Sequence, residues 1–331
     1  MPIIQITTTI GCSNNCIFCP QDIFVKNYYK RNPKAPRLMS LDRFKKILEK
    51  IPKNNTINFC GMSEPFQNPN CHQLVLHAHR SGFKNILLFT TLMGLTLDKA
   101  KAVFETIPFY RYSRYLLSLH LPSKEKIENI IVSKEYLQVL KYVVGKTKRL
   151  ELHYHGRELN HQVRQVLDAG NVKVGHAPPH DRAGLLSGRK FVSSKRKRGH
   201  IKCVCWERVI LPDGTVLLCN SDYSMKYVLG NLLTTNYSSI MSSEVLKFIK
   251  QAFKNDSIET SCRYCHDSRS SGNNCIAYLY NDSFTFNKIP QALKLFFYQR
   301  TPKGYLYVRN VKRKLLSQPT IHNPVIRWFE K

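Results

Sequence analysis

The sequence predicts an α/β protein built on a parallel β-sheet with crossover helices. Six segments with strand patterns alternate with helix patterns in the first half of the chain, and units of this length favour parallel strands joined across the sheet. The chain has 331 residues, of which 43% are hydrophobic. That is enough for one large α/β domain and a smaller one with a sizeable core. An open and a closed barrel both fit the pattern.

Each predicted element has its own local signal. Ser40 is a typical N-cap for a helix over residues 41–51, with Asp42 in the first turn. The predicted strands span residues 3–9, 56–60, 85–90, 115–121, 149–155 and 171–175. The other predicted helices lie near residues 71–81, 97–106, between 124 and 146, and near 160–169. The carboxyl ends of parallel strands share one sheet edge, where ligands bind in such folds.

The pattern changes after residue 184. Residues 185–201 are rich in Ser, Gly, Lys and Arg, which indicates a linker or mobile loop. Residues 209–218 predict a hairpin with its turn at Pro212, Asp213 and Gly214, and a helix over 243–253 follows. We therefore expect a core over residues 1–184, a basic linker or loop over 185–202, a small cysteine-rich domain of hairpin and helix over 203–280, and a basic tail over 281–331.

The charge and the tail leave the partner open. The net charge is +29, which fits an anionic partner such as nucleic acid or an anionic membrane surface, or simply solvated lysines. The tail mixes aromatic and basic residues, a pattern that binds RNA or lipid but more often packs on the body of a protein. The chain starts without a signal peptide pattern, and its longest apolar stretch is too short for a bilayer. We expect a soluble, cytoplasmic protein that is not transmembrane.

The eleven cysteines are the main functional signal. In a reducing compartment, spaced cysteines are more often metal ligands or catalytic groups than disulfides. Cys60 and Cys71 stand apart and are expected to be small buried residues. The other nine form two groups: Cys12, Cys16 and Cys19, then Cys203, Cys205, Cys219, Cys262, Cys265 and Cys275.

The first group has the spacing C-x3-C-x2-C and follows the first predicted strand. Three thiolates suit a [4Fe–4S] cluster with one open iron, since a complete set is four. Cys12, Cys16 and Cys19 are therefore the predicted ligands. The alternatives are a zinc site or three unrelated cysteines, but structural zinc usually takes four ligands and no fourth lies nearby.

This motif, with Phe18 before its last cysteine, resembles the signature of the radical S-adenosylmethionine (SAM) superfamily. The resemblance implies a partial (βα)6 barrel and an open iron that binds the amino and carboxylate groups of SAM. It also implies reductive cleavage of SAM to a 5′-deoxyadenosyl radical that abstracts a hydrogen atom from the substrate. An external one-electron reductant, such as flavodoxin or ferredoxin, is the implied partner.

The resemblance extends to three segments that follow predicted strands. Residues 61–65 are similar to a Gly-Gly-Glu-Pro-type loop, which implies that Glu64, with Ser63 beside it, binds the SAM amino group. The turn that begins at Thr90 resembles the family's Thr-Asn-Gly turn, and Ser118 takes the place of a polar contact to the SAM ribose. A hydrogen bond to backbone is an equal alternative for Ser118. Three histidines at strand ends face either this cavity or the core: His120, His153 and His155.

The second cysteine group resembles the SPASM or shorter twitch extension of radical SAM enzymes. The matching features are a first cysteine, Gly214-x4-Cys219, a Gly-Asn-Leu segment, and Cys262-x2-Cys265. The resemblance implies one auxiliary [4Fe–4S] cluster with four thiolates. Cys203 is slightly favoured over Cys205 as the first ligand, and Cys275 is surplus. A zinc ribbon is the alternative.

The resemblance implies an oxidoreductase-type enzyme that oxidises or cross-links an unidentified substrate. Relatives with this extension modify peptides, protein side chains or sugar-like alcohols. The net charge keeps an RNA-modifying radical SAM enzyme as an alternative. A zinc-stabilised RNA-binding protein without catalysis is the alternative from another class.

Overall fold

The computed structural model describes residues 3–109, 115–168, 172–177, 179, 181–186, 195–203 and 207–270. All of them lie in one compact unit, Met1–Ser271. Cys205, Cys275 and the predicted basic tail lie outside the described residues, as do residues 187–194 of the predicted linker.

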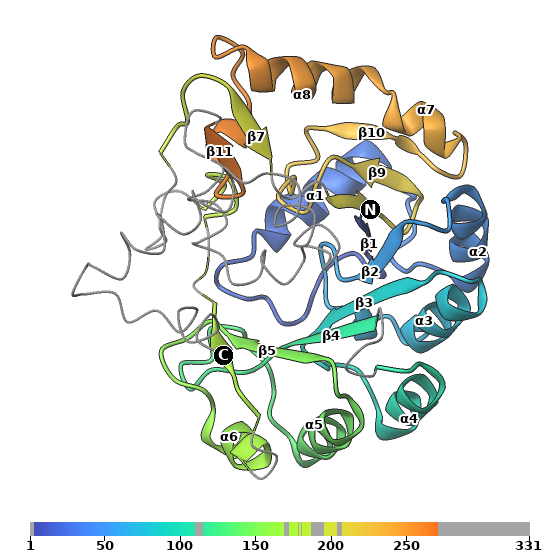
Figure 1. The fold of residues 1–331 in the computed structure, drawn as a ribbon, viewed down its shortest axis with the longest axis vertical. Coiled ribbons are helices and arrows are strands. Elements are labelled where there is room, and N and C mark those ends of the chain that lie inside the picture. The colour runs from blue at the N-terminus through green and yellow to red at the C-terminus, as the bar shows by residue number, and fades with distance from the viewer. Residues whose placement is uncertain are drawn as a thin grey trace, which may run out of the picture. The chain divides into compact units, whose positions relative to one another are not determined.

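A nine-stranded sheet organises the described chain, in the order β10-β9-β8-β1-β2-β3-β4-β5-β6 (Figure 1). Strands β1 to β6 pair in parallel, each with the next along the chain. Their bounds are β1 Ile3–Ile6, β2 Thr56–Phe59, β3 Asn85–Thr90, β4 Tyr115–His120, β5 Leu150–Tyr154 and β6 Gly175–His176. The predicted parallel sheet is therefore confirmed.

Helices cover the outer face of this sheet (Figure 1). They are α2 Leu41–Lys50, α3 Cys71–Arg80, α4 Leu97–Thr106, α5 Lys134–Lys146 and α6 His161–Asp168, with a 3₁₀ turn η1 at Pro65–Gln67. Helix α1 Gln21–Arg31 is not among them and packs in a separate hydrophobic cluster. Along β4, Leu117 and Leu119 are fully buried in the core under the helices. Because strand side chains alternate, Ser118 and His120 point to the opposite, inner face.

Local signals explain which elements the sequence predicts. The Ser40 side chain accepts a hydrogen bond from the Arg43 amide and begins α2 where predicted. Helix α1 was not predicted, because it starts after Pro20 without a side-chain cap. The sixth strand was misplaced: β6 has only two residues, Gly175–His176, at the end of the predicted range.

The predicted hairpin is confirmed as β8 Glu207–Ile210 and β9 Thr215–Leu217, followed by β10 Val228–Asn231. It extends the core sheet, because β8 pairs in parallel with β1, with Ile3 opposite Glu207. A second hydrophobic cluster joins the hairpin to α1 through Phe24, Val209 and Tyr223. Strands β8, β9 and β10 are therefore continuous with the core sheet.

The remaining elements of this half lie beyond the hairpin. Helices α7 Tyr237–Met241 and α8 Glu244–Lys254 follow β10, and α8 confirms the predicted helix. A 3₁₀ turn η2 at Ser261–Arg263 leads to β11 Ser268–Ser270, which pairs antiparallel with β7 Ile201–Cys203. Among the described helices, none is both long and apolar enough to cross a membrane.

Candidate metal centres

The three cysteines of the first group lie in the loop between β1 and α1. The Cys19 amide donates to the Cys16 carbonyl at 2.9 Å, and the Asn15 amide donates to the Cys12 carbonyl at 3.3 Å. Asn15 has φ 42°, a left-handed conformation that Asn tolerates well. The loop is thus wound tightly, and each of its three cysteines is partly buried.

The electrostatics of this loop favour a bound cation. Burial, with the charges of Glu64 and Cys19, raises the pKa of Cys12 to about 11. Burial, with the charges of Cys19 and Cys12, raises the pKa of Cys16 well above its usual range. The three sulfurs are therefore close enough to repel one another as thiolates. Such a set is stable as thiolates when iron neutralises it, so the residues fit an iron–sulfur cluster.

Side chains from the loops after β2 and β3 hold the cysteine loop. Gln67 accepts from the Ser13 amide at 2.8 Å, and its own amide nitrogen lies 3.0 Å from Asn14 Oδ1 and 3.7 Å from Cys12 Sγ. The Asn14 amide donates to Thr91 Oγ1 at 2.9 Å. The predicted convergence at the carboxyl edge of the sheet is therefore observed, and Gln67 and Asn14 are contacts that the motif search missed.

Glu64 is buried and links two of these loops. Its Oε1 accepts from the Phe66 amide at 3.2 Å and from the Thr90 hydroxyl at 2.5 Å. Its Oε2 accepts from the Thr91 amide at 2.6 Å and from the Thr91 hydroxyl at 2.7 Å. Burial raises the pKa of Glu64, and these four hydrogen bonds oppose that rise. The predicted SAM ligand thus also joins the β2 and β3 loops.

The other predicted SAM contacts lie around the same edge. The Ser63 hydroxyl is buried and has no hydrogen-bond partner among the described residues. Thr90 is 3% exposed, and its hydroxyl also accepts from the Leu92 amide at 2.8 Å. Ser118 is 2% exposed on the inner face of β4, opposite Glu151 of β5. The sequence therefore placed all of these residues near the strand ends or the inner face of the sheet.

The three histidines form a ring cluster on the ends of β4 and β5. His155 Nε2 lies 3.3 Å from His120 Nδ1, and His155 Nδ1 lies 2.6 Å from the Ala177 carbonyl. Burial and the neighbouring histidines lower the pKa of His120 to about 3. Phe18 of the cysteine motif packs on His155, with ring centroids 4.5 Å apart. Burial also lowers the pKa of His155, so His120 and His155 are neutral at pH 7 beside the cysteine loop.

The second cysteine group converges on one cavity, although its members are far apart in sequence. The cavity is lined by Cys203, Cys219, Cys262 and Cys265. Cys203 ends β7, Cys219 follows β9, and Cys262 lies in η2. Burial and the charges of Cys203 and Cys265 raise the pKa of Cys262 to about 12. Four mutually repelling thiols fit a metal centre with a complete set of protein ligands.

Arg263, between the last two cysteines, anchors their turn. It is fully buried, and its guanidinium donates to the carbonyls of Ala252 at 2.8 Å and Asn255 at 2.7 Å. It also donates to the carbonyls of Lys197 at 3.0 Å and Gly199 at 3.1 Å. The turn that carries Cys262 and Cys265 is therefore fixed to the end of α8 and to the segment that precedes β7 and Cys203.

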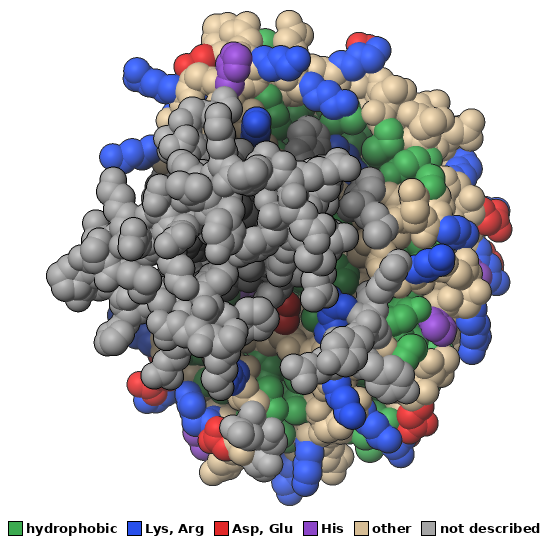
Figure 2. All heavy atoms as spheres, viewed as in Figure 1, with side chains coloured by type: hydrophobic (Ala, Val, Ile, Leu, Met, Phe, Trp, Pro, Cys, Tyr) green, Lys and Arg blue, Asp and Glu red, His purple; other side chains and the backbone are tan. Residues whose placement is uncertain are grey.

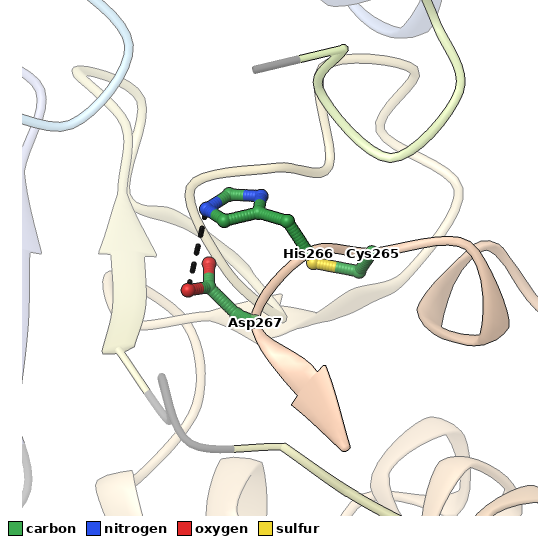
Figure 3. A group of neighbouring side chains, drawn as sticks. All are labelled: Cys265, His266 and Asp267. Carbon is green, nitrogen blue, oxygen red and sulfur yellow. Dashed lines mark ion pairs between the residues drawn. The ribbon is translucent and has the colours of Figure 1, made fainter. Parts of the chain in front are cut away.

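Two further ligand-type side chains follow Cys265. His266 Nε2 lies 3.3 Å from Asp267 Oδ1, and the two side chains face each other beside Cys265 (Figure 3). Burial, with the charges of Arg182 and Arg269, lowers the pKa of His266 to about 4. The contact therefore joins a neutral imidazole to a carboxylate at pH 7.

Comparison with known families decides what these centres are. Residues 6–164 match the model of the radical SAM superfamily, and residues 203–266 match SPASM, described as an iron-sulfur cluster-binding domain. The chain belongs to the radical SAM superfamily. Its cofactors are a [4Fe–4S] cluster and SAM, and its SPASM domain is a further iron–sulfur site rather than a zinc ribbon. No curated protein matches the sequence.

Solved structures share the fold of this radical SAM protein. SuiB from Streptococcus suis, bound to precursor peptide SuiA, has a TM-score of 0.53 at 11% identity, covering 76% of this chain and 67% of SuiB. The structure of anSMEcpe with AdoMet, which is SAM, and the Kp18Cys peptide has a TM-score of 0.51 at 15% identity, covering 80% and 87% of the two chains. These likenesses establish the radical SAM fold with its cysteine-rich carboxyl-terminal half.

Proposed function

We propose that the chain is a radical SAM enzyme that oxidises or cross-links a peptide or protein side chain. The observation that carries this proposal is the arrangement of cysteines: three thiols with no fourth in the β1–α1 loop, and four thiols around one cavity. Cys12, Cys16 and Cys19 would hold the SAM-binding cluster and leave one iron open. Cys203, Cys219, Cys262 and Cys265 would hold a closed auxiliary [4Fe–4S] cluster.

The bound cluster and SAM supply one-electron reductive cleavage and hydrogen-atom abstraction. The protein's own residues orient these groups. Glu64 accepts from the SAM ammonium, since two of its four present donors are threonine hydroxyls that can rotate away. Ser63, Thr90 and Ser118 supply polar contacts in the same region. Gln67 keeps the Cys12 sulfur in place through its amide.

The closed auxiliary site favours oxidation over simple rearrangement. After a hydrogen atom leaves the substrate, one more electron and usually a proton must leave to give a stable oxidised or newly bonded product. A cluster with four protein ligands accepts the electron and has no open iron for substrate. An external one-electron donor, such as flavodoxin or ferredoxin, is proposed to reduce the SAM-binding cluster.

A peptide substrate is favoured over the other classes. Two structures with a TM-score above 0.5 contain peptides in their complexes, SuiB with SuiA and anSMEcpe with Kp18Cys. A sugar-like alcohol remains the second substrate class. RNA modification is the alternative that the net charge of +29 keeps open. On the visible face, the Lys and Arg side chains of described residues are spread around the rim (Figure 2).

The two cysteine sites should separate by mutation. In anaerobically reconstituted protein, replacing Cys262 and Cys265 with alanine should remove about half of the iron, since the two clusters carry equal metal. Cleavage of SAM without substrate should survive. Cys71→Ala is the matched control, because Cys71 is buried in the helix-packed core and should leave the iron content unchanged. Full iron in the double variant would show that the second site holds no cluster.

A further inference from the structure

The loop between β9 and β10 touches both cysteine sites. Cys219 and Asp222 line the auxiliary cavity. One residue later, the Tyr223 hydroxyl lies 3.6 Å from Cys19 Sγ in the first site. The Gln21 amide donates to the same sulfur at 3.6 Å. A side chain of the SPASM domain is therefore one of two polar groups on this sulfur among the described residues.

The structure holds Tyr223 in a fixed position. The Asp222 carboxylate accepts from the backbone amides of Lys226 at 2.9 Å and Tyr227 at 2.8 Å, which closes the loop on itself. The Tyr223 ring is 3% exposed and meets Phe24 of α1 edge-on, with centroids 6.1 Å apart. Burial, the contact with Phe24 and the closed loop thus hold the hydroxyl beside Cys19.

The positively charged side chain of Arg182 also lies between the two cysteine sites. The Arg182 guanidinium lies 5.9 Å from the centre of the Tyr223 ring, and its Nε donates to the Phe18 carbonyl at 3.4 Å. Phe18 directly precedes Cys19, so this charge lies beside the cysteine loop. Ala183, the residue after Arg182, lines the auxiliary cavity.

The Tyr223 hydroxyl and the Arg182 guanidinium both favour the reduced state of a cluster bound at the first site. A tyrosine hydroxyl carries its proton at pH 7, since its usual pKa is about 10. A ligating thiolate has no proton, so in the contact with Cys19 the hydroxyl donates. Hydrogen bonds to the sulfurs and nearby positive charge stabilise the reduced, more negative state of an iron–sulfur cluster and so raise its reduction potential.

We propose that Tyr223 is a positioning residue through which the SPASM domain raises the reduction potential of the SAM-binding cluster. The proposal rests on the proposed function, because it takes Cys19 as a cluster ligand. The auxiliary domain then does more than bind its own cluster. It makes the first cluster easier to reduce by the external one-electron donor, which must deliver the electron before SAM is cleaved.

The test is a redox titration of the reconstituted, full-length holoenzyme followed by electron paramagnetic resonance. The SAM-binding cluster is identified as the signal that changes when SAM is added. In Tyr223→Phe, the ratio of reduced to oxidised cluster at a fixed potential should fall about tenfold, which equals a midpoint about 59 mV more negative for a one-electron couple. The control is Tyr29→Phe, since Tyr29 packs on the same hydrophobic cluster and its midpoint should match the wild type.

The outcomes separate this inference from the proposed function. Equal midpoints in Tyr223→Phe and wild type, with both clusters present, would overturn the inference alone. Loss of iron from Tyr223→Phe would also overturn it, because the hydroxyl would then hold the cluster rather than tune it. A wild-type protein whose signal ignores SAM would overturn the proposed function and the inference with it.

Discussion

Replacing Glu64 with glutamine tests the link between the β2 and β3 loops. Glutamine keeps the shape of the side chain, but one of its two oxygens becomes an NH₂ group that faces donors. Either the Phe66 amide at 3.2 Å or the Thr91 amide at 2.6 Å then loses its acceptor. A hydrogen bond to a charged group contributes about 1.5–3 kcal/mol to stability. Neutral glutamine avoids the cost of burying a charged carboxylate, which offsets part of this loss. We expect a net destabilisation of about 2 kcal/mol.

The assay is anaerobic thermal unfolding, followed by SAM binding at equilibrium. A loss of about 2 kcal/mol corresponds to a Tm lower by about 4–8 °C for a domain of this size. Loss of the carboxylate should also raise the Kd for SAM about tenfold while iron content stays unchanged. Glu105→Gln is the control, because Glu105 is exposed and accepts one bond, from the Tyr142 hydroxyl. A Tm and Kd equal to wild type in Glu64→Gln would refute both roles of Glu64.

Two further predictions concern the strand ends. Since the pKa of His120 is lowered to about 3, the unfolded chain binds a proton below about pH 6.5 that the folded protein does not, so stability is lost as the pH falls. In the wild type, His120 should make the free energy of unfolding about 0.8 kcal/mol larger at pH 7.5 than at pH 6.0, as measured by chemical unfolding. His120→Asn should remove this contribution, whereas the control His161→Asn, at an exposed residue, should keep it. Gly94→Ala should lower the Tm more than Gly82→Ala. Both glycines have positive φ, but a Cβ at Gly94 meets the Phe66 carbonyl oxygen at 2.5 Å while Gly82 has open space; equal losses would contradict this reasoning.

Local patterns were enough for much of the fold. The predicted strand at Asn85–Thr90 and helix at Leu97–Thr106 coincide with β3 and α4, because each lies between clear breaks in the hydrophobic pattern. The two-residue β6 has too little pattern of its own to predict. The pairing of β8 with β1 depends on residues about 200 positions apart, and no local signal encodes it.

In the candidate sites, the sequence predicted the cysteine ligands but not the residues that contact them. Spacing alone predicted the first group, because its three cysteines lie within eight residues. The second group spans residues 203–265, so its prediction depended on the resemblance to the SPASM or twitch pattern. The contacts that support the sites come from remote segments: Gln67 meets Cys12 across 55 positions, and Tyr223 meets Cys19 across 204. The choice of Cys203 as the first auxiliary ligand stays a prediction; it lines the cavity, whereas Cys205 lies outside the described residues.

The formation of 5′-deoxyadenosine tests the central claim most directly. Anaerobically reconstituted, chemically reduced protein should convert SAM to 5′-deoxyadenosine and methionine, as measured by chromatography. Cys16→Ala should abolish this conversion, because two thiolates cannot hold the site-differentiated cluster. Cys71→Ala, which alters a cysteine in the helix-packed core, should convert SAM at the wild-type rate. Full cleavage by Cys16→Ala would contradict the assignment of the β1–α1 loop as the SAM-binding cluster site.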